Sequence, residues 1–491
     1  MTEVVGAGLA LDTSYQRIDS GELLDRIKLP LDFADTKQKL LKGDFINKSE
    51  QRRVTHVLCR SSHSVVGSAE RPSRFDDIVK RVRGGAWRGA TGKSISTVVN
   101  VGVGGSDLGP RLATEALAEF CNDSQSIDVH FVSSMDGAQL YSLFKVIDPE
   151  TTLFILASKS FSTIDTFANI KTIKSWCASV MSHSQWLAHH VIGVSSSAAK
   201  MTDYGIPVAH QVTFGEGVGG RFSLWSAIGL PIALKCGLSV FKKMLEGARA
   251  MDKHFLEAPD TENLPLLMAL YGIYNRSELG INNLVILPYD GRLAMLPDYL
   301  QQLDMESNGK QVTADGNALD IPTGPIVWGG FGPNGQHAFY QHLHQGYDEF
   351  AADFIMVFRR DGIAFSDDVA KNLAEQQQLA VANCLAHRQL MFNGSPNGRS
   401  SREHYVGGHP SNLIVIDELS PEKFGALIAA YEHKIFVQGV YWGLNSFDQP
   451  GVEKGKKIAV KLMEALTDSN VSEEFDQSTS RMIKKFNELC G

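Results

Sequence analysis

Residues 152–166 read TLFILASKSFSTIDT, an apolar run followed directly by a polar stretch. The apolar part shows no polar alternation, which is typical of a β-strand covered on both faces. The polar part, residues 158–166, carries five hydroxyl side chains and one lysine. A helical pattern follows, so these groups stand between a strand and a helix, where ligands bind in parallel sheets.

Similar apolar runs occur on both sides of this stretch and alternate with helical patterns. The runs cover residues 96–103, 128–133, 152–158 and 190–195. The helical patterns between them cover residues 109–120, 137–144 and 163–181. Strands that alternate with helices in this way predict a parallel, doubly wound sheet.

A second block of the chain repeats this plan. Its apolar runs cover residues 283–288, 325–328, 353–358 and 412–416, and its helical patterns cover residues 293–305, 335–345 and 368–391. Helices predicted at 223–236 and 240–254 join the two blocks. The expected fold class is α/β, with two doubly wound, mostly parallel sheets flanked by helices and with helical N- and C-terminal segments.

The chain of 491 residues is too long for one hydrophobic core, so at least two domains are expected. The pattern predicts four parts in order: an N-terminal helical segment packed on the second domain (1–95), a first domain (96–240), a second domain (241–455) and a C-terminal helical segment (456–491).

The composition is that of an ordinary globular protein, with 43% hydrophobic and 21% charged residues. The net charge is −8 and no Lys/Arg run occurs, which argues against a nucleic-acid partner. No stretch approaches the ~20 apolar residues of a membrane span. Residues 1–25 lack the basic and apolar regions of a secretory signal, so we expect a cytoplasmic protein with no membrane partner.

The cysteines give no sign of a disulfide framework or a zinc ribbon. No Cys-x-x-Cys pair occurs among the six, which are Cys59, Cys121, Cys177, Cys236, Cys384 and Cys490. We expect reduced thiols, as is usual in the cytosol.

Two glycine-rich stretches fall short of nucleotide-binding motifs. The stretch WRGATGKS at 87–94 has Trp87 where a Walker A loop needs its first glycine, and it precedes a strand instead of following one. The stretch GVGGSD at 102–107 follows a strand and opens a helix, but Asp107 stands where a dinucleotide fingerprint needs glycine. Its backbone N–H groups still suit an anion or a hydroxyl. We therefore expect no nucleotide cofactor.

Three histidines on one predicted helix raise the question of a metal site. His337, His342 and His344 lack the spacing of three or four residues that would put ligands on one face of a helix. No His-Glu-x-x-His pattern occurs either. We therefore expect no metal.

The hydroxyl-rich stretch at 158–166 has two interpretations. A phosphate there would meet backbone N–H groups, the positive end of the helix dipole and several hydroxyl donors. An ordinary helix N-cap would also explain a serine or a threonine, but one cap needs only one hydroxyl. The surplus of hydroxyls favours a phosphate site.

Two further stretches contain candidate catalytic groups. Gly219 and Gly220 would let the backbone approach a ligand beside the fixed cation Arg221, although a structural arginine after a turn fits the pattern too. Glu306 ends a predicted helix, where a carboxylate meets an unfavourable dipole and could act as a base. A solvated glutamate at a helix end is the alternative.

Over essentially its whole length the sequence resembles the phosphoglucose isomerase family. The resemblance rests on motifs in family order: GGSDLGP at 104–110, GGRFSLWSAIG at 219–229, MESNGK at 305–310, TGPIVWG at 323–329, NGQHAFYQ at 334–341, YEHKIFVQG at 431–439 and GLNSFDQPGVEKGK at 443–456. It implies tandem sugar-isomerase domains and a homodimer whose active sites lie at the interface and are shared between the subunits.

The resemblance also implies a reaction and its residues. The reaction is the reversible isomerisation of glucose 6-phosphate and fructose 6-phosphate in glycolysis and gluconeogenesis, through ring opening and a cis-enediolate, with no cofactor. Glu306 matches the base that moves the proton between C2 and C1, and Arg221 matches the arginine that steadies the enediolate. His337 and Lys456 match the pair that opens the sugar ring. The positions matched to substrate binding are Gly105, Ser106, Ser158, Lys159, Ser160, Thr163, Gly220, Gln302 and Gln449.

Some positions depart from the family pattern. Serines stand at 160 and 162 where threonines are usual, Ile164-Asp165 replaces Gln-Glu, Gly330-Phe331 replaces Glu-Pro, and Pro450 replaces Trp. None of these is a proposed acid or base, so they bear on substrate stringency more than on activity.

Two other functions fit parts of the pattern. One is a dual-specificity phosphoglucose/phosphomannose isomerase, which equal rates with mannose 6-phosphate would favour. The other is a non-catalytic regulator that binds sugar phosphates. The joint presence of Glu306, Arg221, His337 and Lys456 argues against such a regulator, as does the lack of a DNA-binding appendage.

Overall fold

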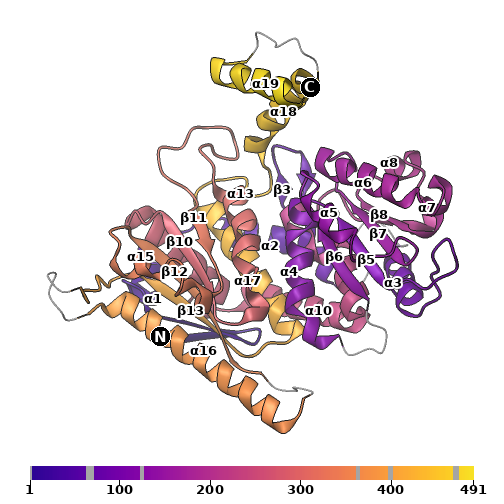
Figure 1. Ribbon diagram of the computed structural model, residues 1–491. Coiled ribbons are helices and arrows are strands. Elements are labelled where there is room, and N and C mark those ends of the chain that lie inside the picture. Colours follow the sequence, from indigo (N-terminus) through magenta and orange to yellow (C-terminus); the bar gives the residue numbers. More distant parts are fainter. Residues whose placement is uncertain are drawn as a thin grey trace. The chain divides into compact units, whose positions relative to one another are not determined.

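The computed structural model describes residues 3–61, 71–121, 127–360, 365–395, 402–467 and 475–490. The chain divides into two compact units, Met1–Ser446 and Phe447–Gly491. The described residues of the first unit form two large β-sheets and one two-stranded ribbon, with helices packed around the large sheets, which confirms the predicted α/β class (Figure 1). Because both sheets lie in one unit, the finer division of residues 1–446 into domains stays a prediction.

The first sheet has five parallel strands in the order β6-β5-β7-β8-β9. Their bounds are β5 Thr97–Val101, β6 Asp128–Val132, β7 Thr152–Ala157, β8 Val191–Ser195 and β9 Gln211–Thr213. Every residue of β5, β7 and β8 is buried, as the unbroken apolar runs predicted. β6 is an edge strand and only partly buried, and the short β9 was not predicted.

Helices flank this sheet at α3 Arg71–Arg83, α4 Leu108–Ala116, α5 Ala138–Leu143, α6 Ile164–Cys177, α7 His183–His189 and α8 Ala198–Asp203. The single helix predicted over 163–181 ends earlier, at Cys177. Ser182 then starts α7 with a capping box, in which its side chain and that of Gln185 each bond the other's backbone N–H.

The second sheet has six strands in the order β1-β2-β13-β12-β10-β11. Their bounds are β1 Glu3–Gly6, β2 Leu9–Tyr15, β10 Asn283–Pro288, β11 Ile326–Gly329, β12 Phe350–Arg359 and β13 Ser411–Glu418. The last four strands are parallel and match the predicted runs. Helices around them include α11 Leu264–Ile273, α14 Gly332–Gly335, α15 Tyr340–Gln345, α16 Asp367–Asn393 and α17 Pro421–Tyr441.

The N-terminal segment is not only helical, contrary to the prediction. After the hairpin of β1 and β2 come α1 Ser20–Arg26, α2 Phe33–Leu41, and a small ribbon of β3 Ile46–Asn47 with β4 Arg52–Arg53. The hairpin turns at Ala7 and Gly8, both with positive φ, and β2 pairs antiparallel with β13. Buried and less buried residues alternate along β2, because only one face of this strand is covered. Ala-Gly is a weaker turn signal than Asn-Gly, so the hairpin could not be predicted from its turn residues.

Two predicted helices of the second block are broken. The helix expected at 293–305 is α12 Leu296–Leu300, then a π-helical turn Gln301–Met305, then α13 Glu306–Asn308. Within the π-helical turn, the buried Asp304 pairs with the buried Lys434 at 3.2 Å. The helix expected at 335–345 is interrupted between α14 and α15.

Two long helices pack closely within the first unit. α9 Leu230–Cys236 leads into α10 Leu238–Glu257, and α10 packs against α17. The approach is so close that a Cβ on Gly247 would lie 1.7 Å from the carbonyl oxygen of Glu422. A larger residue at this crossing would force the helices apart.

The second unit is helical, with a 3₁₀ turn Pro450–Val452, α18 Glu453–Thr467 and α19 Gln477–Cys490. In the parts of the chain that the structure describes, no helix is both long and apolar enough to cross a membrane.

Candidate active site

The first sheet has a topological switch point between β5 and β7. The chain goes from β5 to β6 on one side of β5, and then crosses to β7 on its other side. Where strand order reverses in this way, a crevice opens outside the carboxyl ends of the two strands. The 3₁₀ turn Gly104–Ser106 follows β5, and residues 158–163 follow β7. Together these stretches contain six of the nine predicted substrate-binding residues.

The two predicted glycines have different surroundings. A Cβ on Gly105 would lie 2.0 Å from the carbonyl oxygen of Gly220, so the two backbones are in direct contact and only glycine fits. A Cβ on Gly220 would meet no described atom within 4 Å. The contact brings the turn after β5 against the 3₁₀ helix Gly220–Trp225, which carries Arg221.

The loop after β7 presents its hydroxyls as a group. Ser158 is buried, and its Oγ lies 2.9 Å from the Oγ1 of Thr163, while Ser162 donates to Ser160 at 3.0 Å. Thr163 occupies the N-cap position of α6, yet among the described residues its side chain makes no capping hydrogen bond. The N-cap interpretation therefore does not explain these hydroxyls, and the start of α6 remains suited to an anion.

Lys159 stands between these serines in a largely buried environment with both cations and carboxylates nearby. Burial and the nearby positive charges of Arg52 and Arg221 lower the pKa of Lys159 to about 8, against the opposing effect of Glu50 and Glu216. A lysine poised in this way gains most from the arrival of an anion, because the anion offsets both the burial and the repulsion.

Arg221 and Glu306 form an ion pair, which neither sequence motif alone predicted. Arg221 Nη1 lies 3.3 Å from Glu306 Oε2, and the side chains are 2% and 23% exposed. Arg221 Nε donates to the Ser307 hydroxyl at 2.6 Å, and Nη2 donates to the carbonyl oxygen of Ser446 at 2.6 Å. A buried guanidinium held by several acceptors is a fixed positive charge, beside a carboxylate that solvent or substrate can still reach.

Gln302 connects the π-helical turn to the glycine turn after β5. A Cβ on Gly104 would lie 2.9 Å from Gln302 Nε2, so the amide is next to that turn. Gln302 Oε1 is buried and has no hydrogen-bond partner among the described residues. A buried amide oxygen without a partner is costly, and a ligand hydroxyl would satisfy it.

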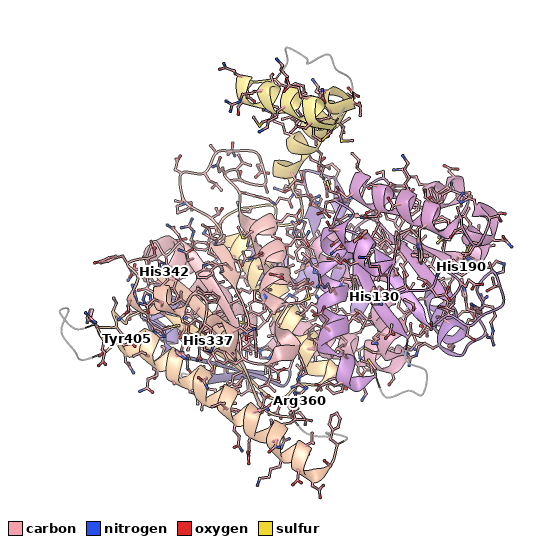
Figure 2. All side chains as sticks on the ribbon, in the orientation of Figure 1. His130, His190, His337, His342, Arg360 and Tyr405 are labelled. Carbon is pink, nitrogen blue, oxygen red and sulfur yellow. The ribbon has the colours of Figure 1, made fainter. Side chains whose placement is uncertain are left out.

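His337 is not brought to this group of residues. It lies between α14 and α15 and its side chain is exposed. Figure 2 shows His337 among the elements of the second sheet, apart from the position of α13, which carries Glu306 (Figure 1). The other two histidines of this stretch have partners of their own: His342 lies 3.2 Å from Asp348, and His344 lies 3.0 Å from His387.

Gln449 and Lys456 belong to the second unit. Gln449 precedes the turn Pro450–Val452, and Lys456 on α18 pairs with Glu453 at 2.8 Å in an exposed position. Their assigned roles stay predictions.

Three groups that help to build the site were missed from the sequence. Ser307 and the Ser446 carbonyl hold Arg221, and Arg52 adds positive charge near Lys159. Ser307 adjoins Glu306 in a quoted motif, so its position was a usable signal. A backbone carbonyl and an arginine in the distant strand β4 leave no signal in sequence spacing.

No group of three or more His, Cys, Asp or Glu side chains within the described ranges is placed to hold a metal ion.

Comparisons with known proteins agree on one family. The phosphoglucose isomerase family profile matches residues 12–483. A glucose-6-phosphate isomerase from Idiomarina loihiensis is 63% identical over 484 residues, which is 98% of this chain and 99% of that protein. One from Psychrobacter cryohalolentis is 44% identical over 98% of this chain and 90% of its own length.

A solved structure is similar as well. The crystal structure of a glucose-6-phosphate isomerase from Chlamydia trachomatis has a TM-score of 0.84 and 29% sequence identity, covering 99% of this chain and 93% of that chain. Its likeness extends over both sheets of the fold described above. On the strength of the family match and these relatives, the chain belongs to the phosphoglucose isomerase family.

Proposed function

We propose that the protein interconverts glucose 6-phosphate and fructose 6-phosphate. The observation that carries the proposal is the pairing of Glu306 with the buried Arg221 at 3.3 Å, close to the turn after β5 that the Gly105–Gly220 contact brings against the Arg221 segment. A base and a fixed cation side by side suit proton transfer next to a carbonyl group. The names of the curated relatives support the same substrate pair.

The phosphate group is the anchor. It would bind at Ser106, Ser158, Lys159, Ser160 and Thr163, where hydroxyls, a lysine and the start of α6 converge. The phosphate takes no part in bond making. Its binding energy positions the open-chain sugar and holds the reactive intermediate in the site. Gln302, Gln449 and the backbone at Gly105 and Gly220 would contact the rest of the sugar.

The proton transfer needs one base. Glu306 removes the proton from C2 of the aldose, and the electron pair of that bond forms the C1–C2 double bond while the carbonyl oxygen gains negative charge. Arg221 stabilises that charge, because a buried cation is effective in a site with little water. Glu306 then returns the proton to C1, the hydroxyl proton on the C2 oxygen passes to the C1 oxygen, and the C2 oxygen becomes the carbonyl of the ketose.

We assign ring opening to His337 and Lys456. We also propose that the active enzyme is a homodimer whose active sites are shared between the subunits. His337 is exposed and has no side-chain partner among the described residues, and Figure 2 shows it away from the position of α13 in Figure 1, the helix that carries Glu306. A histidine in that position suits the site of a neighbouring copy better than the site of its own chain. Two-fold symmetry would give each dimer two such sites.

The setting of the proposed enzyme is the cytoplasm, where it serves glycolysis and gluconeogenesis with no nucleic-acid or membrane partner. The acidic net charge of −8 supports the lack of a nucleic-acid partner. A regulator that only binds sugar phosphates would have no use for the partly buried carboxylate beside Arg221.

The test is a coupled assay of the purified protein with fructose 6-phosphate, in which product glucose 6-phosphate is oxidised by its dehydrogenase. We expect turnover that EDTA does not reduce, and much slower turnover with mannose 6-phosphate. Equal rates with both sugars would support dual specificity instead. If the protein binds sugar phosphates but shows no turnover even at high protein concentration, the result would support a non-catalytic regulator. A requirement for added metal would contradict the proposed mechanism.

A further inference from the structure

Cys121 and Cys236 lie side by side, although 115 residues separate them in the chain. Their Sγ atoms are 2.6 Å apart, slightly more than the ~2.05 Å of a disulfide bond. Both sulfurs also lie 3.5 Å from the carbonyl oxygen of Leu117, so the two thiols share one backbone acceptor. Forming an S–S bond would thus require very little movement of either cysteine.

The pair lies at the C-terminal ends of α4 and α9, two helices that each follow a segment of the candidate active site. α4 begins just after the turn Gly104–Ser106, and Cys121 follows its end by a short 3₁₀ turn. α9 follows the segment that carries Arg221, and Cys236 is its last residue. α4 packs against α9, and at the site the backbones of Gly105 and Gly220 are in contact.

The surroundings of the pair give an oxidant access. A cavity of about 530 Å³ is lined by Cys236, by the basic side chains of Lys80, Arg83 and Lys243, and by Glu422, which pairs with Lys243 at 3.7 Å. Cys236 itself is 4% exposed, whereas Cys121 is only partly buried. This positive charge attracts anionic disulfides, whereas the hydrogen bond with Cys121 and burial raise the pKa of the Cys236 thiol, which leaves Cys121 as the first nucleophile.

We propose that Cys121 and Cys236 form a reversible intramolecular disulfide that fastens the ends of α4 and α9. The oxidant is a low-molecular-weight disulfide such as oxidised glutathione. The thiolate of Cys121, the more exposed sulfur, attacks one sulfur of the oxidant and releases one thiol. The thiolate of Cys236 then attacks the Cys121 sulfur of the mixed disulfide and releases the second thiol. Two protein thiols are oxidised and one disulfide of the oxidant is reduced.

The consequence is resistance to unfolding with activity retained. A bond between residues 115 apart restricts the unfolded chain strongly, while the folded chain already holds both sulfurs in place. We expect oxidation to raise the unfolding temperature by at least about 3 °C. Because the helix starts need not move, kcat for isomerisation should stay unchanged.

The test compares reduced and oxidised forms of the full-length Cys490→Ser variant, which lacks the exposed cysteine of α19. The protein is equilibrated with mixtures of reduced and oxidised glutathione, alkylated, digested without reduction and measured by mass spectrometry. We expect one crosslinked peptide pair, joining Cys121 to Cys236 and two hydrogens lighter than the separate peptides. Dithiothreitol should reverse both the crosslink and the shift in unfolding temperature.

Two variants in the same background serve as matched controls. Cys177→Ser removes a buried cysteine from α6 and should keep the crosslink and the shift on oxidation. Cys236→Ser should lose both and retain at most a mixed disulfide on Cys121. The proposal would be overturned if both thiols stay alkylatable in every glutathione mixture, if only mixed disulfides form, or if crosslinking abolishes isomerase activity.

Discussion

Arg221 is the residue on which the proposed chemistry depends, because its charge is buried and its position is fixed. Its guanidinium bonds the Ser307 hydroxyl and the Ser446 carbonyl, and it faces the Glu306 carboxylate. A buried cation without such partners would be strongly destabilising. The same partners aim one edge of the guanidinium at Glu306, where a developing oxyanion would need it.

Removal of the Glu306 carboxylate tests its role as base. Glu306→Gln keeps size and hydrogen bonding but cannot accept the proton, so we expect kcat to fall by at least about 10²- to 10⁴-fold. Binding of a sugar phosphate, measured by calorimetry, should survive. Asp298→Asn makes the same change at an exposed acid on α12 and should leave kcat unchanged. A loss of less than tenfold in Glu306→Gln would rule out this base.

The pH dependence of substrate capture reports on Lys159. Its pKa is lowered to about 8, so the free enzyme loses this positive charge as the pH rises through that value. The phosphate is then held less firmly, and kcat/KM should fall above about pH 8, mainly through a higher KM. Lys159→Arg keeps its charge and should flatten this part of the profile. Lys171→Arg, at an exposed lysine of α6, should keep the profile of the unaltered protein. Identical profiles for Lys159→Arg and the unaltered protein would contradict the assignment.

Single residues also show what the sequence could reveal. The hydroxyls at 158–163 were identified from their number and place after a strand, and the structure groups them. The meeting of Arg221 with Glu306 could not be predicted from local patterns, because it depends on how distant segments pack. Only the family resemblance put these two residues into one site.

At the scale of elements, a variant in the loop after β7 can test whether its hydroxyls bind phosphate or cap helix α6. Replacing Ser158 and Thr163 together by alanine removes two hydroxyls that bond each other, so neither is left as an orphan. We expect KM to rise far more than kcat falls, because a remote binding contact is lost. The matched double variant Thr172→Ala/Ser175→Ala changes two exposed hydroxyls of α6 and should leave KM alone. An unchanged KM in the Ser158/Thr163 double variant would contradict the phosphate site and support a helix-capping role for these hydroxyls.

The N-terminal hairpin is an element that the sequence did not reveal. Strands buried on both faces, such as β7, were found because their apolar runs are unbroken, whereas β2 is covered on one face and turns at Ala7-Gly8. The breaks at the π-helical turn and between α14 and α15 could not be predicted from the sequence either. At the π-helical turn the break is accompanied by a tertiary contact, the ion pair Lys434–Asp304, which local helix propensity does not reveal.

The hairpin should contribute measurably to stability. Leu11 is fully buried and lies opposite Ile414 in β13, so Leu11→Ala should lower the free energy of unfolding by about 2–5 kcal/mol. Val5→Ala, at a position of β1 that is 67% exposed, should cost less than about 0.5 kcal/mol. Urea unfolding followed by circular dichroism measures both. Equal small effects would show that the hairpin is only loosely attached to the second sheet.

At the scale of the whole molecule, we propose that two chains together complete each active site. The first sheet supplies the phosphate loops, and α13 supplies Glu306 within the same compact unit. His337 is exposed and apart from them, and Figure 2 shows it on the part of the molecule built around the second sheet. A dimer with shared sites accounts for this separation, since the histidine of one copy would complete the site of the other.

The most direct test is complementation between two damaged subunits. Glu306→Gln and His337→Ala chains, each nearly inactive, are unfolded and refolded together, with each variant refolded alone as the control. If a site takes Glu306 from one chain and His337 from the other, every mixed dimer has one doubly damaged site and one intact site. Random pairing makes half of the dimers mixed, so about a quarter of the activity of refolded unaltered protein should return. If both residues belonged to one chain, every site would keep a lesion, and the refolded mixture would show no more activity than the separate variants.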